Sequence, residues 1–213
     1  MSNPIQSPTV GPKTSADGAT VPLRSERMSG LVVQPAHGEM YEAASRGNVY
    51  TISTAAAGIA VTAAMVVSVA SGNAIVGLFN PTTDTNLHIT RAVVVQISGT
   101  AVTGGFCWGT IASPTGITSK GVTGLNNKTF LKGGHKAYAF DGSLPATGAA
   151  ITVPFRYIGG LFPGAITAGN GATFEEVEED LVVGPGCFAG IFYTASGTNS
   201  TVTGSLSWEE VPV

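Results

Sequence analysis

Three histidines are the residues of this chain that could most readily hold a metal ion or act as a catalytic base. They are His37, His88 and His135, and they lie far apart in the sequence. They share none of the short spacings that bring ligands onto one face of a helix or loop. His88 lies on the polar side of an alternating stretch, and His135 lies in a Gly-Gly loop. We therefore predict ordinary surface or interface histidines, with no catalytic, metal-binding or cofactor-binding residue and no cofactor.

The two cysteines, Cys107 and Cys187, both lie within apolar runs. A cysteine beside one of the histidines would supply a nucleophile and a base. Neither cysteine, however, stands in a strand-to-helix elbow or another recognised nucleophile setting. We predict two small buried side chains in a protein made in a reducing cytoplasm. The sequence leaves open whether they form a disulfide.

Acidic side chains are concentrated in one segment near the C-terminal third of the chain. Five carboxylates lie within six residues: Glu175, Glu176, Glu178, Glu179 and Asp180. Carboxylate oxygens suit Ca²⁺ or Mg²⁺. The Asp-x-Asp-x-Asp-Gly spacing is absent, though, and side chains of a strand alternate between its two faces. We therefore favour a solvated loop or a salt-bridging patch for a basic partner surface.

Glu209 and Glu210 add a further acidic pair. Two carboxylates facing each other across a cleft are what a glycosidase needs. Nothing in the sequence places these two across a cleft from the acidic segment, and we predict that the protein is not an enzyme.

Four lysines gather in one Gly- and Asn-rich region: Lys120, Lys128, Lys132 and Lys136. Two interpretations stay open. They could meet an acidic surface on a neighbouring subunit or on a partner lattice, or they could belong to a flexible solvated loop.

The overall composition narrows the possible partners. Charged residues make up 11% of the 213 residues and the formal net charge is −3, which leaves no basic stripe for nucleic acid. The most apolar stretch, 55–70, contains Thr and Ser and is short for a membrane span. Residues 1–30 lack the apolar centre of a secretory signal. So few charges suit an all-β protein whose surface largely contacts other subunits.

The elements that must position these residues are predicted to be mostly strands, after an extended N-terminal arm over residues 1–36. Proline recurs in the arm, with little hydrophobic periodicity, so packing on a neighbouring subunit would be needed to order it. A short helix is predicted over Glu39–Ser45, capped by Gly47. Short β-rich segments separated by Gly, Pro and Asn then follow, and no helical crossovers interrupt them. They are 49–54, 59–69, 104–111, 136–140, 150–158, 174–183, 187–194 and 201–209. We predict an all-β protein whose residues 37–213 form a single two-sheet β-sandwich with jelly-roll topology.

The stretch Asn73–Ile97 consists of two apolar runs joined by the polar loop Pro-Thr-Thr-Asp-Thr-Asn, which predicts a β-hairpin. In its second run one parity carries most of the apolar side chains: Leu87, Ile89, Val93, Val95 and Ile97. Arg91 falls on that same parity. A charge there must be paired within the sandwich, or the strand is bulged, or that face is partly an interface between subunits. We also predict that Cys187–Thr194 and Thr201–Glu209 form the last strand pair.

Several segments together resemble those of small structural proteins of tailed bacteriophages. They are Gly38–Tyr50, Gly58–Val61, Gly77–Pro81, Leu181–Gly186 and Ser207–Pro212. The phage proteins have a jelly-roll sandwich of the tumour-necrosis-factor type. The resemblance covers about residues 38–213 and is carried by packing positions, so it transfers no active-site residue. It implies a homotrimer that binds the major capsid protein or other virion proteins, with neither nucleic acid nor membrane as partner.

Two functions follow as hypotheses. The first is a capsid decoration or cement protein, made in the host cytoplasm and located on the capsid surface of the virion. The alternative is a head- or tail-fibre tip that recognises a host surface ligand. Its binding loops would use aromatic residues such as Tyr138, Phe162 or Tyr193 near strand ends.

Overall fold

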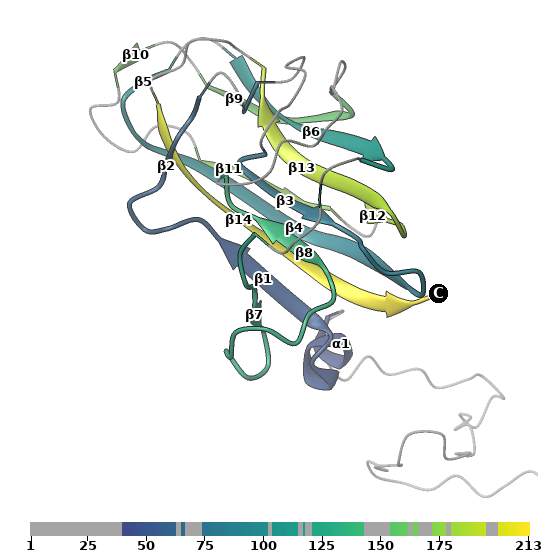
Figure 1. Cartoon of the computed structure of the whole chain (residues 1–213). Helices are drawn as coiled ribbons and strands as arrows, with labels where there is room; N and C mark the ends of the chain where they lie inside the picture. The colour runs from purple at the N-terminus through teal and green to yellow at the C-terminus, as the bar shows by residue number, and fades with distance from the viewer. Residues whose placement is uncertain are drawn as a thin grey trace, which may run out of the picture. The chain divides into compact units, whose positions relative to one another are not determined.

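A computed structural model describes residues 40–62, 65–66, 74–101, 104–114, 117, 121–142, 154–161, 164–165, 172–177, 180–194 and 200–213. The predicted arm over 1–36 lies outside these residues. From Glu42 to Val213 the chain forms one unit. Two antiparallel sheets pack face to face in it, which confirms the predicted all-β, two-sheet sandwich (Figure 1). The jelly-roll topology stays a prediction.

The only helix among the described residues is α1 (Tyr41–Arg46). It ends as the sequence predicts. Gly47 has a φ of 83°, and its amide and that of Asn48 donate to the carbonyls of Ala44 and Ala43. This is the Schellman arrangement, in which a left-handed glycine closes the last turn.

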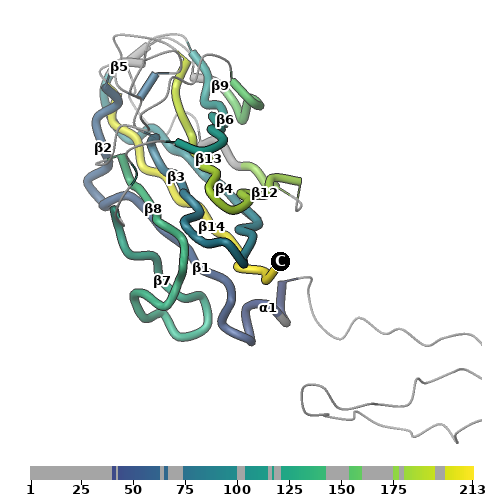
Figure 2. The backbone as a smooth tube through the Cα atoms, turned by 45° about the vertical axis from the view of Figure 1, so that its right-hand side comes forward, coloured from purple at the N-terminus to yellow at the C-terminus, as the bar shows by residue number. Residues whose placement is uncertain are grey.

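The first sheet has the strand order β11-β4-β14-β1-β7, with β12 also paired to β4 and β2 to β14. Its strands are β1 (Val49–Ser53), β2 (Ile59–Ala60), β4 (Thr85–Ser98), β7 (Leu125–Asn126), β11 (Ala172–Glu176), β12 (Val182–Val183) and β14 (Thr201–Pro212). The long strand β14 lies between β1 and β4 in both Figure 1 and Figure 2. These three strands form the centre of the sheet.

The second sheet has the order β8-β3-β13-β6-β9. Its strands are β3 (Val76–Phe79), β6 (Gly104–Ala112), β8 (Tyr138–Phe140), β9 (Arg156–Leu161) and β13 (Cys187–Tyr193). A small separate pair consists of β5 (Thr100–Ala101) and β10 (Gly164–Ala165). Pro154 lies two residues before the edge strand β9, where a missing amide donor is tolerated.

The predicted hairpin over Asn73–Ile97 is wrong in its pairing, although both strands exist. β3 pairs with β13 and β8 in the second sheet, whereas β4 pairs with β14, β11 and β12 in the first. The loop Asn80–Asp84 therefore carries the chain from one sheet to the other as a β-arch. The predicted pairing of the last two strands fails in the same way, because β13 and β14 belong to different sheets.

The predicted β-rich segment 59–69, a β-branched run that could bend around Ala63-Ala64, is strand over only part of its described residues. Only Ile59–Ala60 form a strand. The Val61 amide donates to Ser200, and the Met65 amide turns back to Thr62. Loop hydrogen bonds thus replace the ladder that the β-branched residues would favour.

Arg91 marks a β-bulge in β4. On β14, Ser207 is opposite Arg91 and the next residue, Trp208, is opposite Ile89, so Thr90 has no separate partner. The extra residue reverses the facing of all residues beyond it. Leu87 and Ile89 are buried, but after the bulge the buried side chains are those of Ala92 and Val94.

Of the readings offered for Arg91, the bulged strand is the correct one. Its guanidinium lies on the outer face of the sheet and pairs with Glu176 at 3.0 Å, with both side chains more than half exposed. The predicted inward facing of Val93, Val95 and Ile97 is wrong for the same reason.

The main core lies between the sheets and contains Trp108, Trp208, Tyr193, Phe106 and Leu206. A second apolar cluster covers the opposite face of the second sheet. It contains Ala74, Cys107, Ile117, Phe140, Phe188 and Phe192. The second sheet is therefore buried on both faces, which explains why β13 reads as the continuous apolar run CFAGIFY rather than an alternating one.

Candidate functional site

The residues singled out for chemistry lie in separate places. His37 lies outside the described residues. His88 lies on β4, partly exposed, as predicted. Within the part of the chain that the structure describes, no group of three or more His, Cys, Asp or Glu side chains could hold a metal ion.

The acidic segment is divided among cations of the same chain. Glu176 pairs with Arg91, whereas Glu175 pairs with Arg156 at 2.8 Å. Asp180 binds the same Arg156 guanidinium, and Glu175 also accepts a 2.7 Å hydrogen bond from the Trp108 indole. These three acids form their salt bridges within the chain, and pairing of the segment with a basic partner surface stays a prediction. Glu178 and Glu179 lie outside the described residues.

Arg156 connects the edges of the two sheets. It lies on β9 of the second sheet, while Glu175 lies on β11 of the first. Because the side chain of Glu175 is only 17% exposed, this ion pair is shielded from water more than a surface pair. The arrangement clamps one side of the sandwich and leaves Glu175 without a role as an acid or base toward a ligand.

The loop Asn80–Asp84 is held by a buried amide. Asn80 is fully buried, and its amide nitrogen donates to the carbonyls of Thr85 at 2.7 Å and Val183 at 2.9 Å. Its carbonyl oxygen accepts from the Thr82 amide and hydroxyl. Nearly all the hydrogen-bonding capacity of the side chain is thereby used. A single asparagine closes the arch between the sheets.

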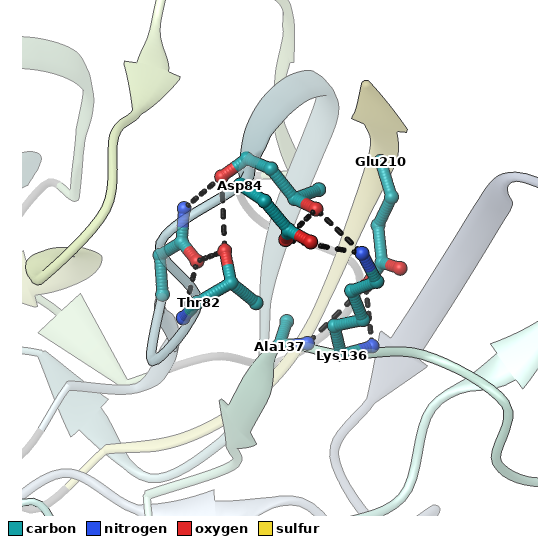
Figure 3. Close-up of polar contacts among 7 residues, drawn as sticks. Thr82, Asp84, Lys136, Ala137 and Glu210 are labelled. Atoms are coloured by element: carbon teal, nitrogen blue, oxygen red, sulfur yellow. Dashed lines mark hydrogen bonds and ion pairs between the residues drawn. The ribbon is translucent and has the colours of Figure 1, made fainter. Parts of the chain in front are cut away.

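A second layer of contacts ties this loop to the segment before β8 (Figure 3). The Lys136 ammonium donates to Asp84 at 3.2 Å and to the Thr85 hydroxyl at 2.8 Å. The amides of Lys136 and Ala137 both donate to Glu210, whose side chain enters from β14. The hydrogen bond from Thr85 and the contact with Lys136 lower the pKa of Asp84. The carboxylate that pairs with Lys136 therefore belongs to the same chain.

His135 is not the surface histidine that the sequence predicts. It is 2% exposed and packs edge-on against Tyr50 and Trp208. Its Nδ1 lies 2.9 Å from the carbonyl of Ala137, and its Nε2 accepts from the Gly124 amide at 2.9 Å. Since a carbonyl can only accept, Nδ1 carries the proton and Nε2 does not. Both nitrogens are engaged in fixing loop backbone, which leaves neither for a metal or a substrate.

Glu209 and Glu210 point to opposite faces of β14. Glu210 is 8% exposed and accepts the loop amides, while Glu209 lies on the outer side. Because they lie on opposite faces, the two adjacent glutamates cannot act together on one bond. The polar groups at this end of the sandwich hold the loops in place. Burial and the nearby charge of Glu210 also raise the pKa of Tyr50.

The same loop region contains a feature that the sequence reading missed, the hairpin tip Gly124–Gly133. Asn126 organises it: its side-chain oxygen accepts from the amides of Lys128 and Thr129, and its side-chain nitrogen donates to Gly47 at 2.6 Å. Backbone bonds between Asn126 and Leu131, and between Gly133 and Gly124, complete it. The signal in the sequence was Phe130-Leu131, two large apolar residues inside an otherwise polar Gly- and Asn-rich loop.

Both of these residues point away from the protein. Phe130 is 76% exposed and Leu131 is 69% exposed. Phe130 also has a φ of 58°, in the left-handed region that a bulky residue rarely adopts. Hydrogen bonds of the Asn126 side chain and of the backbone hold this loop. Both interpretations of the lysines stay predictions, and Lys120 lies outside the described residues.

Of the three aromatic residues suggested for ligand-binding loops, the structure contradicts the prediction for one. Tyr193 is fully buried in the main core, so its suggested role is wrong. Tyr138 is partly buried against Phe79, and Phe162 lies outside the described residues.

The outer face of the first sheet has a continuous patch of small uncharged side chains. It contains Thr51, Val93, Val95, Thr203, Ser205 and Ser207, all partly exposed and in register across β1, β14 and β4. The charged pair Arg91–Glu176 stands at one margin. We call this surface the hydroxyl–valine face.

The cysteines are both free thiols. The residue opposite Cys107 on β13 is Phe192, at the other end of that strand from Cys187, so the two thiols cannot form a disulfide without rearrangement. Cys107 is buried, as predicted, while Cys187 is partly exposed.

Thiol labelling should therefore separate the two cysteines. Burial raises the pKa of the Cys107 thiol to about 11. We expect iodoacetamide at pH 8 to modify Cys187 in the folded protein and to reach Cys107 only in denaturant, as mass spectrometry of peptides would show. Equal labelling of both thiols in the folded protein would contradict the buried position of Cys107.

The same thiol should make the fold sensitive to alkali. The folded state keeps the Cys107 proton at a pH where the unfolded chain has lost it, so stability is intact below about 9 and falls toward 11. We expect a loss of about 2 kcal/mol over this range, measured by urea unfolding. The Cys107→Ala variant should be less stable at neutral pH but should show a smaller alkaline loss. An unchanged alkaline loss would assign the effect to other groups such as Tyr50 and Tyr193, whose pKa values burial also raises.

Comparison with protein-family models, with curated proteins and with solved structures gives no match for this chain. In the described part, no helix has the length and apolar character needed to span a membrane.

Proposed function

We propose that this protein is a structural component of a tailed-bacteriophage virion, most simply a capsid decoration protein that binds the major capsid lattice as a homotrimer. The observation that carries the proposal is that the buried and loop-facing polar side chains bind within the chain. At the loop end of the sandwich, Asn80, Lys136, His135 and Glu210 all bind other parts of the same chain. Such a domain is built to be held rigid, which suits a part that reinforces an assembly.

The hydroxyl–valine face supports association between subunits. Its side chains are short and uncharged, so burying them costs little side-chain entropy. A buried hydroxyl needs a hydrogen-bond partner, which Thr51 and Ser207 already supply to each other. The low charged content of the chain, 11%, fits a protein that covers much of its surface with other subunits. A cement that joins several capsomers also multiplies weak contacts into avidity. The resemblance of residues 38–213 to phage structural proteins points in the same direction.

The experiment is to count this protein in purified virions and to measure its mass in solution. Quantitative gel or peptide mass spectrometry should find hundreds of copies per particle, and light scattering during size exclusion should give three chains. A handful of copies per particle would instead favour the fibre-tip alternative, for which binding of the isolated protein to host cells is the direct test. A protein absent from particles would refute both.

A further inference from the structure

The hairpin tip Gly124–Gly133 combines properties that a surface loop without a partner has no reason to combine. Phe130 and Leu131 are among the most exposed large apolar residues of the described chain, and they are adjacent. Leu125, at the base of the same tip, is 42% exposed. Contiguous exposed apolar side chains rimmed by polar ones are typical of interaction sites.

The tip is also prepared for binding. Asn126 holds the loop through its own side chain, and the Thr129 hydroxyl accepts from the Leu131 amide at 3.3 Å. A loop fixed in this way loses little conformational entropy when a partner binds it.

Phe130 carries backbone strain that a glycine or asparagine at this position would avoid. A φ of 58° suits glycine or asparagine, both of which are abundant in this part of the sequence. A phenylalanine there costs stability, and a strained residue of this kind is expected where the position serves binding. A fluid lipid bilayer would accept a relaxed loop equally well, whereas a defined pocket requires one fixed direction of the ring.

The charge around the tip indicates the chemistry of the pocket. Lys128 and Lys132 are exposed beside Phe130 and Leu131, and in the described residues no carboxylate lies within ion-pair distance of either. Lys136, by contrast, pairs with Asp84. A second copy of the tip would bring lysines against lysines, so a self-contact of tip on tip is disfavoured.

We propose that this tip attaches the sandwich to the particle. Phe130 and Leu131 enter an apolar pocket on another virion protein, and carboxylates at the rim of that pocket meet Lys128 and Lys132. The inference rests on the proposed function and extends it by assigning the attachment to the sandwich. One tip is small, so each contact is weak and the subunits of one oligomer must act together.

The test uses purified full-length protein and particles assembled without it, with binding measured by co-sedimentation. The variant Phe130→Asn/Leu131→Ser removes the apolar tip with residues that suit the backbone. The matched control, Phe155→Ser/Tyr157→Ser, removes two large exposed side chains elsewhere on the surface, which are 57% and 66% exposed. Thermal unfolding should show that the tip variant is as stable as the wild type, because it relieves the strain at Phe130.

The expected result is that the tip variant binds particles about 10-fold or more weakly, while the control variant binds like the wild type. Lys128→Glu/Lys132→Glu should also weaken binding, and Lys128→Arg/Lys132→Arg should not. If the tip variant binds particles as tightly as the wild type, this inference is overturned and the proposed function is left intact. No wild-type binding to particles would refute both. Tip-dependent binding to vesicles of anionic phospholipid, with none to particles, would assign the tip to a membrane and overturn the protein pocket.

Discussion

Replacing Asn80 by leucine is expected to lower the free energy of unfolding by about 3 kcal/mol, although leucine is close in size and the site is fully buried. The change leaves the carbonyl of Val183 and the amide of Thr82 without the partner that Asn80 supplies. Buried polar groups that lose their partners cost more than the hydrogen bonds contribute when present. Urea unfolding, followed by tryptophan fluorescence, would measure the loss.

Asn80→Asp provides the matched control, because it keeps the shape and the oxygen acceptor. As a carboxylate it would face the carbonyl oxygens of Thr85 and Val183, at the positions where the amide now donates. Its pKa in the folded state would be raised, since burial and the two carbonyls disfavour the charge. The variant should therefore be unstable at pH 7 and should regain stability as the pH falls. A leucine variant as stable as the wild type would show that the arch does not depend on this side chain.

Gly190→Ala is the second substitution with a large expected effect, a loss of about 3 kcal/mol or more. Gly190 lies in the middle of β13, between the paired residues Gly77 and Gly109. An added Cβ would lie 2.6 Å from the Cβ of Ala74 and 3.0 Å from the ring of Phe188. The row of glycines makes room for that ring in the second apolar cluster. The added methyl group would displace Ala74 and Phe188 and so disrupt the packing of this cluster on the second sheet. Chemical denaturation would report the loss.

Gly184→Ala serves as the control for Gly190, because the nearest atom to its added Cβ is the Asn86 side chain at 3.9 Å. This variant should have nearly wild-type stability. The double variant Ala74→Gly/Gly190→Ala removes the closest clashing atom and should recover part of the loss. If Gly190→Ala and Gly184→Ala cost the same, the packing around Gly190 must be looser than described.

The positions of most of the longer strands could be predicted from the sequence, but their pairing could not. Alternation predicted β1, turn residues on its N-terminal side marked the start of β14, and the helix cap at Gly47 followed from local chemistry. The loop after β3 reads equally well as a hairpin turn or an arch, because Pro81 and its polar neighbours end a strand in either case. Which sheet receives β4 is decided by contacts with β14, more than a hundred residues further along the chain.

The prediction of which β4 side chains face the core failed for a related reason. A bulge at Thr90 shifts the alternation by one residue, and the local sequence contains no glycine to announce it. Arg91 was the visible sign, since a charge on an otherwise apolar parity is best explained when the parity itself changes. One ionisable residue was more informative here than the four valines and isoleucines of the same parity.

The candidate site was even less accessible to sequence reasoning. His135 looked like a loop histidine because its neighbours are two glycines, yet Tyr50 and Trp208 enclose it from strands far away in the chain. Glu210 is buried for the same reason, because its partners are amides of residues 136 and 137. Phe130 was missed because what distinguishes it is the exposure of its side chain and its positive φ angle, and neither can be read from the sequence.

The central place of β14 has a consequence for how the protein folds. β1 and β4 are made early, but each has β14 as its neighbour, and the Thr54 hydroxyl bonds to an amide 150 residues later. Neither strand can complete its hydrogen-bond ladder until the ribosome has synthesised β14, near the C-terminus of this sequence. Contacts so distant in sequence make folding slow. Until β14 arrives, the newly made chain exposes two unpaired strand edges, so folding competes with aggregation during that interval.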